Sequence, residues 1–418
     1  MKNSSPAVIS SRGITWNTGC KPVRSALLAA SCALLFLACS SSPERLAYTV
    51  SPGEYRTSVL DFVGRSLRST IQTVGDRFPE ATENGVWNAN AGGWTGGYFA
   101  GMLWMMFEAT GDSAWLAPAS RYTWLLESNK TDVGNIDVGI LFYPSFVKGY
   151  RVTGDERYRR VGLTGARTMM RRFIPSGGYF QNWGRLGDPE QDGFVIIDCL
   201  INLDQIYWAF VETGDSSFYR AATSHARRTM ESHVRSDGSS HQVVELDPET
   251  GRMLRGFHKQ GYSDESTWSR GQSWGIYGFT RVYGHTREPA FLKAAMRVAD
   301  WFIEHLAEDF VPYWDFQAPN IPDEARDSSA GSMAASALIE LAGYMENPRD
   351  RERYLQAARN ILASLTRNYL TQNLPGRNDG VLTGGTYFFA VGGSVDQANI
   401  WGDYYYLEAI LRLLGIKL

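Results

Sequence analysis

The chain has 418 residues, of which 44% are apolar and 20% are charged, so it can bury the large core of a globular protein. Its formal net charge of −3 argues against a dedicated nucleic-acid binder and provides no long-range attraction for an anionic ligand. Aromatic residues make up 13% of the chain, an excess that fits a carbohydrate site but also the aromatic packing of a large helical fold.

Residues 1–39 have the pattern of a bacterial export signal. Basic residues precede an apolar segment at 26–37, which is too short to span a bilayer comfortably. The sequence Phe36-Leu37-Ala38-Cys39 resembles a lipoprotein cleavage site and predicts a lipid on Cys39. An ordinary secretory signal cut near Ala38 is the alternative. We therefore expect an exported protein, periplasmic or anchored to the outer membrane, with the lipid as its only membrane contact.

The rest of the chain contains no linker or low-complexity stretch. We predict a short tether at residues 40–50 and one domain at residues 51–418. Cys199 is the only cysteine of this domain, so no internal disulfide is expected, and its apolar neighbours predict a small buried side chain. Cysteines and histidines form no cluster with metal-ligand spacing, and we expect no metal.

A weak internal repeat predicts the fold class. Thr-Gly-Asp triplets at 110–112, 153–155 and 213–215 each lie between two helical patterns, and variants occur at 285–289 and 347–350. Glycine ends the first helix of each pair and aspartate caps the second. The preceding helices are expected at 98–110, 139–152, 200–212, 275–283 and 332–344, with helices at 56–74 and 404–414 forming a sixth pair. Six helical hairpins predict an all-α fold, an (α/α)6 barrel, whereas an α-solenoid would have more even repeats.

In such a barrel the segments between hairpins gather at one mouth, and two of them carry isolated carboxylates. Asp137 and Asp198 each lie among aliphatic residues where an inner helix begins. Apolar surroundings raise the pKa of a carboxyl group, which a general acid near neutral pH requires. The alternative for each is a helix cap or a buried aspartate bonded to backbone.

Segment 261–275 concentrates hydrogen-bonding groups beside aromatic rings. Its candidate ligand-binding side chains are Trp268, Arg270, Gln272 and Trp274. Indole faces stack on sugar rings, while arginine and glutamine bind carboxylate and hydroxyl groups in fixed directions. The alternative is a helix start that buries two tryptophans and is capped by Ser266 or Ser269. His241 lies in a predicted loop and is a better site candidate than the histidines within helical patterns.

Together these motifs resemble the unsaturated glucuronyl hydrolases, glycoside hydrolase family eighty-eight. The matching segments are 94–97 (WTGG), 136–139 (IDVG), 197–203 (IDCLINL), 268–279 (WSRGQSWGIYGF), 314–319 (WDFQAP) and 401–405 (WGDYY). Related unsaturated rhamnogalacturonyl hydrolases share the barrel and both aspartates, but usually carry a different residue where Gln272 stands. Gln272 therefore favours the glucuronyl branch.

The resemblance implies a six-hairpin barrel that acts on lyase products, such as chondroitin or hyaluronan disaccharides with a Δ4,5-unsaturated uronic acid at the non-reducing end. It implies that Asp198 is the general acid and base, with Asp137 as its partner. The residues implied to contact the unsaturated sugar are Trp94, His241, Gln260, Trp268 and Arg270. No metal or organic cofactor is implied. Two alternatives remain, namely rhamnogalacturonyl specificity on the same barrel and a non-catalytic surface glycan-binding lipoprotein.

Overall fold

The computed structural model of the protein describes residues 48–376 and 378–418. These belong to the compact unit Arg45–Leu418. The predicted signal sequence, Cys39 and most of the predicted tether lie outside the described residues. Among the helices that are described, none is both long enough and apolar enough to cross a membrane.

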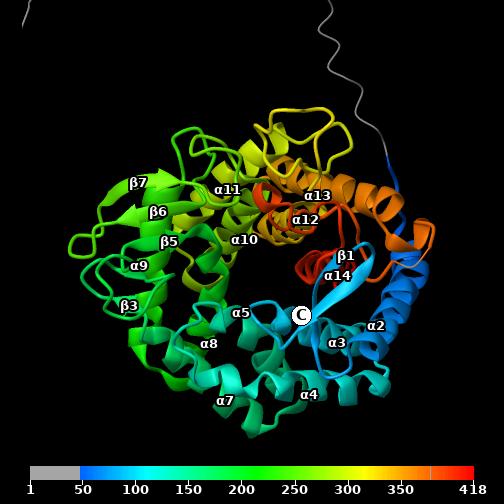
Figure 1. The fold of residues 1–418 in the computed structure, drawn as a ribbon, viewed down its shortest axis with the longest axis horizontal. Helices are drawn as coiled ribbons and strands as arrows, with labels where there is room; N and C mark the ends of the chain where they lie inside the picture. The colour runs from blue at the N-terminus through cyan, green and yellow to red at the C-terminus, as the bar shows by residue number, and fades with distance from the viewer. Residues whose placement is uncertain (1–47, 377) are drawn as a thin grey trace, which may run out of the picture. The chain divides into compact units, whose positions relative to one another are not determined.

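Six helical segments form a closed inner ring, as the repeat predicts (Figure 1). They are α3 (Gly96–Thr110), α5 (Val138–Phe142) continued by η4 (Tyr143–Val147) and α6 (Lys148–Thr153), α8 (Leu203–Thr213), α10 (Ser269–Thr286), α12 (Ser328–Gly343) and α14 (Ile400–Leu413). Each segment contacts the next, and α14 contacts α3. In α3, α10 and α12 buried residues occupy almost every position because these helices are covered on all sides.

The second helix of each hairpin lies outside this ring. These outer helices are α2 (Leu60–Val74), α4 (Leu116–Leu125), α7 (Glu156–Met170), α9 (Ser216–His233), α11 (Pro289–Glu304) and α13 (Pro348–Asn368). Short helical turns precede or join them at α1 (Pro52–Glu54), η1 (Tyr55–Val59), η2 (Ser113–Trp115), η3 (Glu127–Thr131), η6 (Thr371–Asn373) and η7 (Phe389–Val391). The outer helices are amphipathic, with one face against the inner ring and the other in water.

The Thr-Gly-Asp turns have the predicted geometry. Gly111, Gly154 and Gly214 adopt left-handed φ angles of 69°, 69° and 72° directly after an inner helix. The aspartates that follow accept a backbone hydrogen bond at 2.9 Å from the second residue beyond them, as helix caps do. The expected helical hairpins are therefore confirmed.

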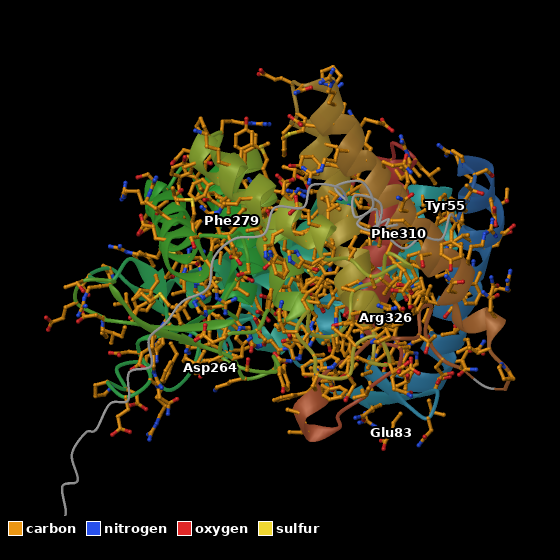
Figure 2. All side chains as sticks on the ribbon, turned by 90° about the horizontal axis from the view of Figure 1, so that it is seen from above. Tyr55, Glu83, Asp264, Phe279, Phe310 and Arg326 are labelled. Atoms are coloured by element: carbon orange, nitrogen blue, oxygen red, sulfur yellow. The ribbon has the colours of Figure 1, made fainter. Side chains whose placement is uncertain are left out.

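Short antiparallel strands, which the sequence analysis did not predict, lie in the segments that lead into the inner helices. They are β1 (Phe78–Glu83) with β2 (Val86–Asn90), β3 (Phe173–Ile174) with β4 (Tyr179–Phe180), and a sheet of β5 (Phe194–Ile196), β6 (Val243–Leu246) and β7 (Met253–Phe257) in the order β5-β6-β7. We call these segments the mouth loops. Figure 2 shows Glu83 and Asp264, from two of them, toward the same edge of the molecule, with Phe279 of α10 deeper among the helices.

The helix α10 begins earlier than predicted. It starts at Ser269 rather than Gly275, so residues 269–275 of the segment 261–275 are already helical. Its N-cap position is Trp268, without a side-chain cap bond, so the cap by Ser266 or Ser269 that the alternative interpretation included is not formed. Both hydroxyls are used elsewhere, since Ser266 Oγ donates to Asp315 at 2.7 Å and Ser269 Oγ donates to the Trp314 carbonyl at 3.1 Å.

Candidate active site

The mouth loops enclose a pocket of about 260 Å³. Its lining residues are Trp94, Asp137, Ile140, Trp183, Ile196, Asp198, Ile201, Gln242, Lys259, Gln260, Trp268, Arg270, Trp274, Tyr387 and Phe388. They come from segments scattered between residues 94 and 388, so only the closed ring brings them together. Seven of the nine residues proposed from sequence line this pocket.

The side chain of Asn202 connects the segment that carries Asp198 to the segment that carries Asp137. Asn202 Nδ2 donates to Asp137 Oδ1 at 3.3 Å, while its Oδ1 accepts from the backbone N–H of Ile140 at 2.8 Å. The loops approach closely at Gly139, where a Cβ would lie 2.5 Å from the Cα of Asn202. Asp198 lies in η5 (Ile197–Asn202), directly after β5. This packing fixes both carboxylates in the floor of the pocket.

The surroundings of the two carboxylates favour their protonated forms. Burial raises the pKa of Asp198 to about 7, and the charge of Asp137 adds to this rise while Arg270 opposes it. Burial also raises the pKa of Asp137 to about 6, against the hydrogen bond from Asn202. Asp198 Oδ1 is buried and has no hydrogen-bond partner in the protein. An unengaged carboxyl oxygen with a pKa near neutrality is suited to proton transfer.

A buried guanidinium forms one wall. Arg270 is 2% exposed and pairs with Asp327 at 2.8 Å. It also donates to the carbonyl oxygens of Thr386 and Tyr387, at 2.6 Å for Tyr387, and its Cζ lies 4.4 Å from the ring centre of Trp268. These contacts hold the guanidinium rigidly at the pocket, where it provides a fixed positive charge for an anion.

Aromatic rings lie beside this guanidinium, whose Cζ is 5.4 Å from the ring centre of Trp401. The indole of Trp94 packs against Trp401 with ring centres 5.1 Å apart, and its Nε1 donates to the Tyr387 hydroxyl at 3.1 Å. Rings of this kind bind the C–H faces of sugars.

Several lining residues were not found from the sequence. Gln242 fixes Gln260, because its Oε1 accepts from the Gln260 backbone N–H at 2.8 Å and its Nε2 donates to Gln260 Oε1 at 2.8 Å. Lys259 Nζ lies 3.7 Å from the ring centre of Trp183. In segments 48–376 and 378–418, no three histidine, cysteine, aspartate or glutamate side chains gather into a possible metal site.

Comparison with known proteins agrees with this geometry. The sequence model of Glycosyl Hydrolase Family 88 matches residues 68–410. The chain belongs to this family. An unsaturated glucuronyl hydrolase from Bacillus sp. GL1 is 38% identical over 366 residues, which cover 86% of this chain and 96% of that protein. An unsaturated chondroitin disaccharide hydrolase from Streptococcus pneumoniae is 35% identical over 379 residues, which cover 89% and 95% of the two chains.

The fold of this family 88 protein also matches a solved relative. The crystal structure of an unsaturated glucuronyl hydrolase from Bacillus sp. GL1 superimposes with a TM-score of 0.82 at 37% identity, over 86% of this chain and 96% of that one. The predicted barrel and the resemblance to the unsaturated glucuronyl hydrolases are therefore confirmed.

Two candidate residues of the family 88 chain lie outside the pocket lining. The His241 ring lies next to Arg235, with Nδ1 3.0 Å from Nη2, and burial lowers its pKa to about 4. The next residue, Gln242, lines the pocket instead.

The amide of Gln272 is engaged within the protein. Its Oε1 accepts from Ser240 Oγ at 2.8 Å, and its Nε2 donates to the carbonyls of Gly238 and Val298 at 2.8 and 3.0 Å. The side chain is fully buried. The amide therefore ties α10 to neighbouring segments, and the assignment of Gln272 to substrate binding stays a prediction.

Proposed function

We propose that this family 88 protein hydrates the C4=C5 double bond of a Δ4,5-unsaturated uronic acid at the non-reducing end of lyase-generated glycosaminoglycan oligosaccharides, and so releases that sugar as its ring-opened keto-aldehyde. The observation that carries the proposal is the pair Asp137 and Asp198, whose pKa values are raised to about 6 and about 7 beside a buried arginine. The names of its relatives, a glucuronyl and a chondroitin disaccharide hydrolase, support this substrate class.

The C4=C5 bond of the substrate is a vinyl ether, so the first step is protonation. Asp198 donates its proton to C4, which leaves an oxocarbenium-like cation at C5. Water attacks C5 and returns a proton to Asp198, which restores the acid. The hemiketal at C5 then opens to a ketone, and the hemiacetal left at C1 collapses to an aldehyde and the free aglycone sugar. Because attack is at C5, the carboxylate-spacing rule for retaining and inverting glycosidases does not apply.

Asp137 has two roles in this scheme. In its ionised form it stabilises the positive charge that develops at C5. Its negative charge also raises the pKa of Asp198 and so keeps the acid protonated near neutral pH. The fixed bond from Asn202 holds it in place for both.

The remaining pocket residues bind the sugar. Arg270 provides the positive charge for the uronate carboxylate, and Gln260 provides an amide that is held by Gln242. Trp94 stacks on the unsaturated ring, with Trp268 and Trp274 completing the apolar lining.

The test follows the ultraviolet absorbance of the conjugated alkene in unsaturated chondroitin or hyaluronan disaccharides. The wild type should remove the absorbance, while Asp198→Asn should lower kcat by at least about 10²-fold and still bind the disaccharide. Asp61→Asn, an exposed aspartate of α2, is the control and should keep wild-type rates.

Other outcomes would replace the proposal. If the wild type consumes only unsaturated pectin fragments, rhamnogalacturonyl specificity is correct. If it binds the disaccharides without consuming any alkene, the protein is a glycan-binding protein. Equal rates for wild type and Asp198→Asn would retain the reaction and exclude Asp198 as the acid.

We further propose that the chain is exported and lipidated on Cys39, which the N-terminal pattern supports. Expression in a Gram-negative host should place the wild type in the membrane fraction, and Cys39→Ser should move it to the soluble fraction. A wild type found in the soluble periplasm would favour the ordinary secretory signal.

A further inference from the structure

One residue of the pocket connects three of the proposed sugar-binding side chains. The carbonyl oxygen of Tyr387 accepts hydrogen bonds from Arg270 Nη2 at 2.6 Å and from Gln260 Nε2 at 3.1 Å. Its hydroxyl accepts from Trp94 Nε1 at 3.1 Å and donates to Glu80 Oε1 at 3.3 Å. No sequence motif singled out Tyr387 or Glu80.

We propose that Tyr387 is a positioning residue for the reaction, and that Glu80 acts through it to set the orientation of the Trp94 indole for substrate stacking. The inference rests on the proposed function and deepens it. It predicts a role in substrate affinity for Glu80, which does not line the pocket.

The two hydrogen bonds form a series that runs from Trp94 through the Tyr387 hydroxyl to Glu80, and each bond supports the other. A phenol has one proton, and here it is directed to the carboxylate of Glu80, so a lone pair is available to the N–H of Trp94. An indole has a single donor, and its bond to Tyr387 fixes the rotation of the ring within the aromatic wall. Without the phenol oxygen, the wall still fills the space but no longer specifies one ring orientation.

Glu80 is in turn fixed by the first hairpin. Its Oε2 accepts from Asn90 Nδ2 at 3.0 Å, across the pair β1 and β2. Asn90 Oδ1 also accepts from the backbone N–H of Gly92 at 2.7 Å, two residues before Trp94. The hairpin therefore aligns both the backbone that carries Trp94 and the carboxylate that orients its partner.

The first experiment compares steady-state kinetics of wild type and Tyr387→Phe on an unsaturated chondroitin disaccharide. The variant keeps the ring and the backbone carbonyl and removes only the hydroxyl. A stacking contact made equally in ground and transition states affects KM rather than kcat, so KM should rise about three- to ten-fold, the size expected for one net hydrogen bond, with kcat within about twofold.

The control is Tyr369→Phe. Tyr369 donates to Asp309 at 2.7 Å, a phenol–carboxylate bond of the same kind, but it does not line the active pocket. Its KM and kcat should match the wild type. An equal change in both phenylalanine variants would show a general effect of losing a phenol and would overturn the proposal.

A double-mutant cycle tests the part of Glu80. Glu80→Ala should raise KM, and in the Tyr387→Phe background the same substitution should change KM less than about twofold, because its route to Trp94 is already lost. Additive effects would exclude the series of bonds, and an unchanged KM in Tyr387→Phe would exclude the positioning role. A wild type without turnover would instead reject the proposed function, so the two failures are distinguishable.

Discussion

In the proposed mechanism the two aspartates have different roles, and the pKa of Asp198 is raised further than that of Asp137. With Asp198 at about 7 and Asp137 at about 6, the productive state has Asp198 protonated and Asp137 ionised. The profile of kcat/KM against pH should therefore be bell-shaped, with its maximum between about 6 and 7.

Asp137→Asn should shift the basic limb of this profile to lower pH. Removing the negative charge takes away one cause of the raised pKa of Asp198, so the acid loses its proton at lower pH. The acidic limb, which reports protonation of Asp137, should disappear. The measurement is kcat/KM from pH 4 to 9 on an unsaturated disaccharide. A basic limb that stays at the wild-type pH would contradict the electrostatic coupling.

Individual site residues were predictable where the type of side chain and its neighbours in the sequence indicate a chemical role. Isolated carboxylates in apolar loops and an arginine between indoles indicated Asp137, Asp198 and Arg270 without any contact map. Gln242 was not found because its position at the pocket depends on the pairing of β6 with β5, in which Val243 lies opposite Ile196. That pairing joins residues too far apart for a local pattern to show.

Among elements, α5 and η5 make a close backbone contact beside the two aspartates. At Gly139 an added methyl group would lie 2.5 Å from both the Cα and the carbonyl oxygen of Asn202, which is backbone and cannot move aside. Gly139→Ala should therefore destabilise the protein by about 2 kcal/mol or more. Asn202 would also be displaced from Asp137, so kcat should fall at temperatures where the variant is folded.

Urea unfolding followed by tryptophan fluorescence measures this cost. Gly343→Ala is the matched control, since it lies at the end of α12 with no atom within 4 Å of its Cβ position. Alanine is the better helix former, so this control should be neutral or slightly stabilising. A Gly139→Ala midpoint equal to that of the control would show that the two segments separate easily.

The helical hairpins were predictable because three of them turn at a local signal, a glycine followed by a capping aspartate, and two more turn at a variant of it. The strands were not predicted, although one hairpin carried a local signal. The sheet of β5, β6 and β7 depends on distant pairing, with β5 almost 50 residues before β6. The first hairpin did carry a local signal, the Asn84-Gly85 turn with φ angles of 50° and 75°, which is the preferred pair for a two-residue β-turn.

For the whole molecule, a buried cluster of charges joins the C-terminal halves of α10, α12 and α14 to the first turn of α8. Arg281 of α10 contacts Asp204 of α8 and Glu340 of α12, each at 3.0 Å, and Arg412 of α14 also pairs with Glu340. Burial opposes ionisation of Glu340, yet the two arginines overcome it and lower its pKa to about 2. The cluster thus holds the ring together through paired charges.

Arg281→Met should lower the free energy of unfolding by about 3–5 kcal/mol at pH 7, because two buried carboxylates lose their shared partner. Arg353→Met, at an exposed pair with Asp300, should cost less than about 1 kcal/mol. In the wild type, the contribution of Glu340 is complete above its unfolded pKa of 4.5 and is lost as pH falls toward about 2. Without Arg281 this loss should begin at higher pH, and unchanged acid sensitivity would contradict the assignment.

The hydrogen bond between Trp94 and Tyr387 links residues 293 positions apart, and the first hairpin bonds to the segment before the last helix through Thr82 and Ala398. Because the chain is synthesised from its N-terminus, Thr82 and Trp94 are made early, whereas Tyr387 and Ala398 are made near the end. A nascent chain that has already released Asp137 and Asp198 from the ribosome still lacks α14, the helix that closes the inner ring against α3. We therefore expect the polypeptide to remain inert during translation, and to acquire activity in one step when the final tenth of its length joins the beginning.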